Sequence, residues 1–273
     1  MGTFVIAECA NTWRFGTDQL VNAYRLIDAV KACGADAAKF QWTSDPLAMA
    51  ARRHGLASEF EILAWPVEWL AKLKAHCDEV GIEFMCTVFL AEDIPVVAPL
   101  VRRFKVASAE SGDVEFVGAH QDYGREIIIS YAFGIRPNPI YLSRAILCVC
   151  SYPTPIEQLN LARIEPSHIG ESRAFDGLSD HTTSVLTGAL AVARGGTHIE
   201  KHVRLHDTPS TNPDFPHSLE ADRPVCIDPS VCGRTCSAFG EYVAFVREAE
   251  RAMGTGNDEM QECEKPFESR RVK

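Results

Sequence analysis

Two histidines, His181 and His202, each end a short run of apolar or small residues, as the tip of a buried strand does. The runs are residues 176–181 and 199–202, and a helix-like stretch over 182–194 lies between them. A strand–helix–strand order brings both tips to the same edge of a parallel sheet. Two neutral imidazoles that meet there suit a divalent metal with open positions. Either histidine alone could simply be held by a hydrogen bond, but the pair favours a metal site.

Short β-rich runs alternate with amphipathic stretches along the whole chain. Apolar residues at helical spacing predict helices between residues 17 and 34, 66 and 81, 182 and 194, and 238 and 253. Eight strands that alternate with helices are typical of a closed (β/α)8 barrel. An open doubly wound sheet is the alternative, but no glycine-rich nucleotide loop follows the first strand. The predicted strands are 4–8, 37–41, 82–89, 104–107, 126–130, 146–150, the run leading into Ser179, and 197–202.

One connection in this series is too short for a regular helix. Residues 131–144 contain Gly134, Pro137 and Pro139, which leave little room for a full helix. We therefore expect a (β/α)8 TIM barrel over residues 1–253, with an abbreviated or missing fifth helix. Residues 254–273 are polar and are interpreted as a C-terminal tail or truncated linker. A missing helix would leave apolar surface that a second copy could cover, so the sequence is compatible with a homodimer.

The bulk composition bounds the class of protein. The chain has 273 residues, 46% of them hydrophobic, which is enough to fill a large core. Its net charge of −10 argues against nucleic acid or an anionic membrane as a main partner. No signal peptide and no apolar run long enough to cross a bilayer is present, so we expect a cytoplasmic protein. The ten cysteines are interpreted as reduced thiols.

The working residues of such barrels lie at the carboxyl ends of the strands. Lysines with hydroxyl donors suit a phosphate or phospho-carboxylate, and two imidazoles suit a metal that polarises a carbonyl. Lys39 and Lys105 have apolar neighbours, which argues against solvated charges, whereas Thr87 and Ser130 could merely satisfy backbone groups. Glu8 or Glu110 could accept a proton. The strand-end candidates are Glu8, Lys39, Gln41, Thr87, Lys105, Ser108, Glu110, Ser130, Tyr152, Ser179, Asp180, His181, Lys201 and His202.

Many of these runs, in the same order through nearly the whole chain, resemble the sialic acid synthase family. The resemblance rests on residues 6–8, 26–29, 34–41, 81–84, 105–108, 151–155, 178–182, 199–202, 213–214 and 218–220. It implies a (β/α) barrel that condenses phosphoenolpyruvate with an N-acetylated hexosamine, typically N-acetylmannosamine. It also implies a divalent metal, Mn²⁺ first, with Mg²⁺ or Co²⁺ as alternatives.

The resemblance assigns roles by position. His181 and His202 would hold the metal, and Glu110 would sit at the reacting carbons. Glu8, Tyr152 and Asp214 would face the sugar or its metal-bound end. The enol carbon would attack a metal-polarised aldehyde, water would add to the resulting cation, and phosphate would leave with C–O cleavage. Phosphoenolpyruvate would be bound by Lys39, Thr87, Lys105, Ser108, Ser130 and Ser179.

The chain departs from the family pattern at four places. The usual Asn-His pair of the first loop is Asn11-Thr12, the Thr-Gly after Ser130 is Tyr131-Ala132, and a polar pair before Tyr152 is Val149-Cys150. The chain also ends about where the family begins its C-terminal antifreeze-protein-like domain. Because these positions read the acceptor, we hypothesise an acceptor other than N-acetylmannosamine.

Two other functions remain open on the sequence. A metal-dependent isomerase or hydrolase barrel would need several carboxylates around its metal and leaves the paired lysines unexplained. A barrel that has lost its acceptor site could act as a binding or regulatory protein, and a synthase could also take a non-sugar aldehyde. Lys39, Lys105, His181 and His202 argue against the non-enzymatic alternative.

Overall fold

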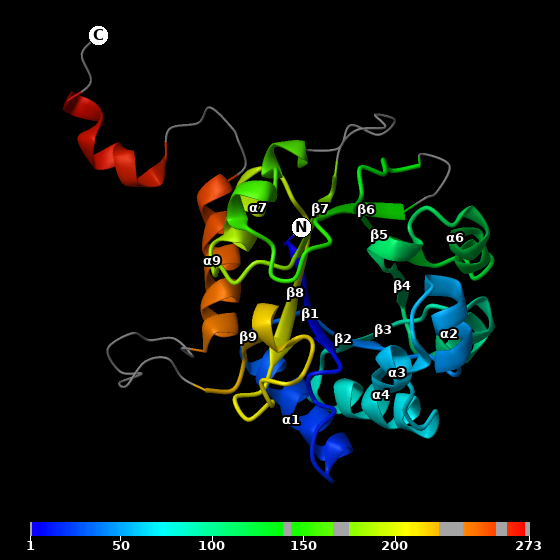
Figure 1. The fold of residues 1–273 in the computed structure, drawn as a ribbon. Helices are drawn as coiled ribbons and strands as arrows, with labels where there is room; N and C mark the ends of the chain where they lie inside the picture. The colour runs from blue at the N-terminus through cyan, green and yellow to red at the C-terminus, as the bar shows by residue number, and fades with distance from the viewer. Residues whose placement is uncertain (1, 139–142, 166–174, 224–236, 255–260, 271–273) are drawn as a thin grey trace.

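Eight parallel strands form the wall of a barrel (Figure 1). The computed structural model describes residues 2–138, 143–165, 175–223, 237–254 and 261–270. The strands follow the order β3-β2-β1-β8-β7-β6-β5-β4, and β3 and β4 lie next to each other, so the wall is nearly closed. The predicted (β/α)8 barrel is confirmed. The strands are β1 (Phe4–Ala10), β2 (Ala37–Gln41), β3 (Glu83–Thr87), β4 (Arg103–Val106), β5 (Glu126–Tyr131), β6 (Ser143–Cys148), β7 (Gly177–Asp180) and β8 (His198–Arg204), and a short β9 (Leu219–Glu220) pairs with β8.

Helices cover the outside of this wall (Figure 1). Three of them have clear N-terminal caps: Asp45 accepts hydrogen bonds from the first turn of α2, Asp113 accepts one in the first turn of α6, and Ser237 accepts one at the start of α9. α7 packs against α9, and α1 packs against α4. The helices are α1 (Gln19–Ala32), α2 (Pro46–Arg53), α3 (Ala57–Phe60), α4 (Glu68–Val80), α5 (Ile94–Val97), α6 (Val114–Gln121), α7 (Thr187–Ala193) and α9 (Ala238–Met253).

Two connections differ from regular βα units. As predicted, the described part of the β5–β6 connection, residues 132–138, contains no helix. The helix predicted from residue 182 begins only at Thr187. Thr182 turns back instead, because its backbone N–H and its hydroxyl both donate to the Asp180 carboxylate, at 2.9 and 2.8 Å. Such local side-chain bonds compete with helix formation.

The barrel interior has an apolar floor and a polar upper layer. Ile6, Ala37, Met85 and Ile128 are fully buried and pack together as one cluster inside the barrel. Side chains alternate between the two faces of a strand, so the residues two positions later also point inward. Those residues are Glu8, Lys39, Thr87 and Ser130.

A close backbone approach supports one side of this layer. Gly177 of β7 lies in register with His198 of β8, and a Cβ atom at Gly177 would come within 1.7 Å of the His198 carbonyl oxygen. Only glycine fits there, so Gly177 sets how closely β7 and β8 approach. The pairing aligns Ser179 with Glu200 two residues farther on.

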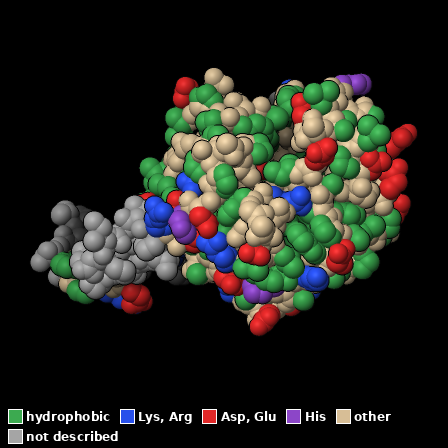
Figure 2. All heavy atoms as spheres, turned by 60° about the horizontal axis from the view of Figure 1, so that its bottom comes forward, with side chains coloured by type: hydrophobic (Ala, Val, Ile, Leu, Met, Phe, Trp, Pro, Cys, Tyr) green, Lys and Arg blue, Asp and Glu red, His purple; other side chains and the backbone are tan. Residues whose placement is uncertain are grey.

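The distribution of charge on the surface and the lengths of the helices do not point to a particular ligand or partner. On the face shown in Figure 2, acidic and basic side chains are interspersed with apolar ones. Within the described ranges, none of the helices combines the length and the apolar character needed to cross a bilayer. A 3₁₀ helix over Glu262–Arg270 follows α9 in the polar C-terminal stretch.

Candidate active site at the carboxyl end of the barrel

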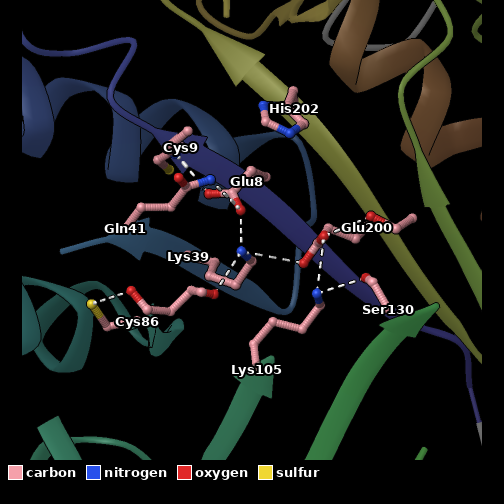
Figure 3. Close-up of polar contacts among 12 residues, drawn as sticks. Glu8, Cys9, Lys39, Gln41, Cys86, Lys105, Ser130, Glu200 and His202 are labelled. Atoms are coloured by element: carbon pink, nitrogen blue, oxygen red, sulfur yellow. Dashed lines mark hydrogen bonds and ion pairs between the residues drawn. The ribbon is translucent and has the colours of Figure 1, made fainter. Parts of the chain in front are cut away.

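Four buried charges form a connected chain above the apolar floor (Figure 3). Lys39 forms an ion pair with Glu8 and lies 3.5 Å from Oε2 of Glu200. Lys105 lies 3.5 Å from Oε1 of the same Glu200. Each of these four charged residues is at most 4% exposed. We call these four residues and the hydroxyls around them, Thr87, Ser130 and Ser179, the lysine half of the site.

The hydroxyl groups add hydrogen bonds to these charges, although Glu200 Oε2 is left without one. The Lys39 ammonium donates to Thr87 Oγ1 at 3.1 Å, and the Lys105 ammonium donates to Ser130 Oγ at 2.7 Å. Ser179 Oγ donates to Glu200 Oε1 at 2.8 Å. The structure therefore brings together six residues that the sequence predicted for this site: Glu8, Lys39, Thr87, Lys105, Ser130 and Ser179.

Glu200 is a central residue that the sequence prediction missed. It bridges both lysines, although only its neighbours on β8 were chosen as candidates. A signal was available, because Glu200 lies two residues before His202 and strand alternation puts both on the inner face. The same alternation excludes Lys201 from the barrel interior. Its side chain points out of the barrel, where its ammonium lies 3.1 Å from Asp180 and faces the Tyr242 ring. The candidacy of Asp180 and Lys201 was therefore wrong, since both serve the packing of α9.

The pKa values of the two carboxyl groups of the lysine half are shifted in opposite directions. Burial raises the pKa of Glu8 above its usual value, although Lys39 opposes this change. Burial would also raise the pKa of Glu200, but Lys105 and Lys39 outweigh it and lower that pKa to about 2. Neighbouring carboxylates whose pKa values are pushed apart are suited to different roles. Glu200 is a permanent counter-ion, whereas Glu8 can take up a proton.

A second group of polar residues lies beside the first and contains three histidines. The rings of His181 and His202 have centroids 5.3 Å apart, and that of His217 lies 4.5 Å from His202. One Asp214 oxygen lies 3.9 Å from His202 Nδ1 and 3.5 Å from His217 Nε2. We call these four residues the histidine half. Glu8 and His202 are in register on β1 and β8, so the two halves adjoin there.

Two of the histidines, His181 and His202, are in the form that binds metals. The His181 ring contacts the Val149 carbonyl oxygen through Nδ1 at 2.9 Å, and because a carbonyl only accepts, Nδ1 carries the proton and Nε2 is free to bind. Burial lowers the pKa of His181 to about 4 and that of His202 well below its usual value. Buried nitrogens of His202 and His217 have no hydrogen-bond partner. Neutral imidazoles, unpartnered nitrogens and a carboxylate together fit a divalent metal.

Asp214 and His217 reach the site on the loop that follows β8. Asn212 donates to the Asn11 carbonyl oxygen at 3.0 Å and accepts from the Asp214 backbone N–H at 3.0 Å, which fixes the loop over the end of β1. β9 then pairs with the tip of β8, directly after Ser218. The sequence predicted Asp214 but missed His217, because no local pattern marks a histidine in such a loop.

Glu110 is buried at the same edge, just after β4, and is held by a residue from outside the wall. Arg53, the last residue of α2, donates from Nε to Glu110 Oε1 at 2.9 Å, while Glu110 Oε2 is buried without a partner. Burial raises the pKa of Glu110, and Arg53 holds this rise back. Arg53 was not predicted, since α2 folds back over the barrel through tertiary contacts.

Three further candidates lie around these groups: Tyr152 and Ser108 beside the histidine half, and Gln41 beside Glu8. The ring of Tyr152 lies 4.3 Å from that of His181 and is 49% exposed, so it forms part of the accessible surface of the site. Ser108 is buried and interacts with the Cys148 thiol, whose sulfur lies 3.9 Å from His181 Nδ1. Gln41 contacts Glu8 from β2 at 3.4 Å.

Comparison with known proteins agrees with this geometry. The model of the NeuB family matches residues 26–136 and 143–224, which include most of the residues described above. A pseudaminic acid synthase of Campylobacter jejuni is 28% identical over 295 aligned positions, covering 95% of this chain and 77% of that protein. The human N-acetylneuraminate-9-phosphate synthase is 26% identical, with 96% of this chain and 74% of that protein covered.

The fold is shared with a solved structure. The N-acetylneuraminic acid synthetase of Leptospira borgpetersenii superimposes with a TM-score of 0.81 at 22% identity. The superposition covers 99% of this chain and 91% of that one. At this identity the match supports the barrel architecture, and the chemistry has to be argued from the side chains.

Proposed function

The chain belongs to the NeuB family, and from this premise we propose that it condenses phosphoenolpyruvate with an aldose. The products would be a 2-keto-3-deoxy sugar acid and inorganic phosphate. The observation that carries the proposal is the lysine half: two buried lysines and three hydroxyls converge at the carboxyl end of the barrel. Ammonium and hydroxyl donors are the groups that bind a phosphate and a carboxylate on one small molecule.

The reaction divides between the two halves of the site. Lys39 and Lys105, with Thr87, Ser108, Ser130 and Ser179, would bind phosphoenolpyruvate and fix its enol carbon toward the histidine half. His181 and His202 would hold a divalent metal, Mn²⁺ first, which when bound polarises the aldehyde of the acceptor. Tyr152 and Asp214 would contact the acceptor at that end, on the accessible side of the histidines.

The proposed reaction forms a C–C bond and breaks the C–O bond between phosphoenolpyruvate and its phosphate. The enol carbon of phosphoenolpyruvate forms a C–C bond to the aldehyde carbon, and the aldehyde oxygen takes up a proton to become a hydroxyl. Water adds to the adjacent carbon of phosphoenolpyruvate, which carries the phosphate, and the C–O bond from that carbon to phosphate breaks, which leaves a ketone. Of the two protons that water supplies, one balances the proton on the new hydroxyl and the other leaves with phosphate. Glu8 and Glu110 are suited to the proton transfers, because burial raises the pKa of each carboxyl toward neutrality.

The acceptor itself is the finer part of the proposal. We infer an aldose other than N-acetylmannosamine, because the residues around Tyr152 on the acceptor side are Val149, Cys150 and a half-exposed ring. A panel of aldoses and N-acetylhexosamines, assayed with phosphoenolpyruvate and Mn²⁺, would identify the acceptor by the product mass. Turnover of N-acetylmannosamine alone would contradict this part of the proposal.

The activity is tested by phosphate release in the same assay. Lys105→Met should lower turnover by about 10²–10³-fold, because it removes a charged donor from the phosphoenolpyruvate site. Lys72→Met is the matched control, since Lys72 is exposed on α4 and should be replaceable without effect. Absence of phosphate release with every aldose, or equal activity of both variants, would overturn the proposed function.

A further inference from the structure

His217 is a buried histidine whose ring nitrogens make no hydrogen bond, although Nε2 lies 3.5 Å from an Asp214 oxygen. It is 2% exposed, and neither Nδ1 nor Nε2 has a hydrogen-bond partner. Burial of a polar group without a partner is unfavourable, and buried polar side chains in folded proteins are nearly always bonded. A ligand that takes a nitrogen lone pair would remove this cost.

The position of His217 is set by several interactions and is not an accident of a loose loop. Ser218 Oγ donates to the Asp214 carbonyl oxygen at 2.6 Å, which closes the short 3₁₀ turn over Phe215–His217. Leu219, two residues after His217, is in register with Val203 at the tip of β8. The loop is therefore attached to the same strand that carries His202.

The neighbours of His217 are the other residues of the histidine half. Its ring centroid lies 4.5 Å from that of His202 and 6.1 Å from that of His181. Ligand atoms of His202, Asp214 and His217 all lie within 4.8 Å of one another. Two atoms bound to one ion, each at about 2.0–2.2 Å, lie about 3–4 Å apart, so only a small adjustment separates these groups from coordination.

We propose that His217 is a ligand of the metal together with His202 and Asp214, whose ligand atoms lie near its own, and that His181, with its ring 5.3 Å from that of His202, completes the site as a third imidazole. The inference rests on the proposed function only for the use of a divalent metal. Four protein ligands would leave coordination positions of the metal open for an acceptor. Three imidazoles favour transition metals over Mg²⁺, which prefers oxygen ligands and water.

The alternative is that His217 only packs. Its ring lies 4.9 Å from the ring of Tyr152, so it could serve as an aromatic support for that side chain. A packing role and a ligand role make different predictions for metal binding, and they make the same prediction for activity. The test must therefore read the metal directly.

X-ray absorption of the wild-type protein loaded with Co²⁺ reads the ligands without any mutation. Three imidazoles per ion are expected, and a fit to two would overturn the inference. Calorimetric titration with Co²⁺ and Mn²⁺ provides the second measurement. Loss of a residue that only supports a metal ligand typically weakens metal binding by roughly 10–100-fold. His217→Gln should weaken binding by at least this factor, because it would remove a ligand itself. A fit to three imidazoles would also predict that Mg²⁺ in excess fails to displace Co²⁺.

His198→Gln is the matched control for these titrations. His198 is also buried and lies on β8, but at its amino end, and its Nδ1 contacts Thr197 Oγ1 at 2.9 Å. Its replacement should leave the affinity for Co²⁺ unchanged, and equal weakening by both variants would overturn the inference. If the wild type binds no metal, the metal dependence of the proposed function fails as well. If it binds through two histidines and still releases phosphate, only the role of His217 fails.

Discussion

The two halves of the site satisfy their polar groups in different ways. In the lysine half, the ammonium groups of Lys39 and Lys105 are paired with the carboxylates of Glu8 and Glu200. In the histidine half, by contrast, His202 Nδ1 and both nitrogens of His217 are buried without a hydrogen bond, and the Asp214 carboxylate lies 3.9 Å from His202 Nδ1 and 3.5 Å from His217 Nε2. Among the residues of the lysine half, Glu200 Oε2 alone lacks a hydrogen bond, and it lies 3.5 Å from the Lys39 ammonium, whereas the histidine half has three such buried nitrogens.

This contrast supports the ligand that we propose for each half. The lysine half holds as many negative as positive charges, so an anion that enters must share donors that the carboxylates already use. The raised pKa of Glu8, caused by burial, lets that carboxyl be neutralised when an anion arrives. The histidine half offers one lone pair from each neutral imidazole and the carboxylate of Asp214, which together suit a cation. A phosphate and a metal can therefore bind side by side without competing for the same groups.

The largest effect should come from breaking a charge pair in the lysine half. Lys39→Met leaves Glu8 buried without its cation, and removal of one partner of a buried pair costs about 3–5 kcal/mol in the free energy of unfolding. The double variant Lys39→Met/Glu8→Gln should recover part of this loss, because no buried charge is then left unpaired. Urea unfolding of both single variants and the double variant measures the coupling. Additive effects would show that the pair does not act as a unit.

A smaller effect should come from completing the histidine half. A divalent metal at 100 times its dissociation constant stabilises the folded state by about 2.7 kcal/mol. For a chain of this size, that free energy corresponds to a rise of about 5–10 °C in Tm. The shift should disappear in His202→Ala and on addition of a chelator. An equal shift in His202→Ala would place the metal outside the histidine half.

The smallest effect should be the pH dependence introduced by Arg53→Ala. Because the folded-state pKa of Glu110 is raised, its contribution to stability is present below the unfolded pKa and is lost as pH rises through the folded pKa. Arg53 holds that pKa down, so its removal should cost about 1 kcal/mol more at pH 7.5 than at pH 4.

Thermal unfolding of the Arg53→Ala variant and the wild type at both pH values measures this difference. Glu110→Gln provides the control, since an uncharged amide does not titrate. In the Glu110→Gln background, Arg53→Ala should cost the same at both pH values. A pH-dependent cost that persists without Glu110 would mean that another group responds to Arg53.

Much of the lysine half could be predicted from the sequence because it lies on strands. Each strand shows its own apolar pattern, and alternation with period two gives the face of each residue. Ile6 and Glu8, or Met85 and Thr87, therefore share the barrel interior whatever the rest of the chain does. The same rule places Glu200 inside the barrel and Lys201 outside it, so the sequence already contained the information needed to choose correctly between these two residues.

The (β/α)8 architecture, the short fifth connection and the strand-end positions of Lys39, Lys105, His181 and His202 were thus determined by the sequence itself, since they follow from local periodicity and from the residues that interrupt it. Only the tertiary structure decided that His217 meets His202 and that Arg53 reaches Glu110. Both residues lie outside the strands of the barrel wall, and no periodic pattern governs where such residues go. Their places are set by the pairing of β9 with β8 and by the packing of α2 over the barrel, which join residues that are distant in the chain.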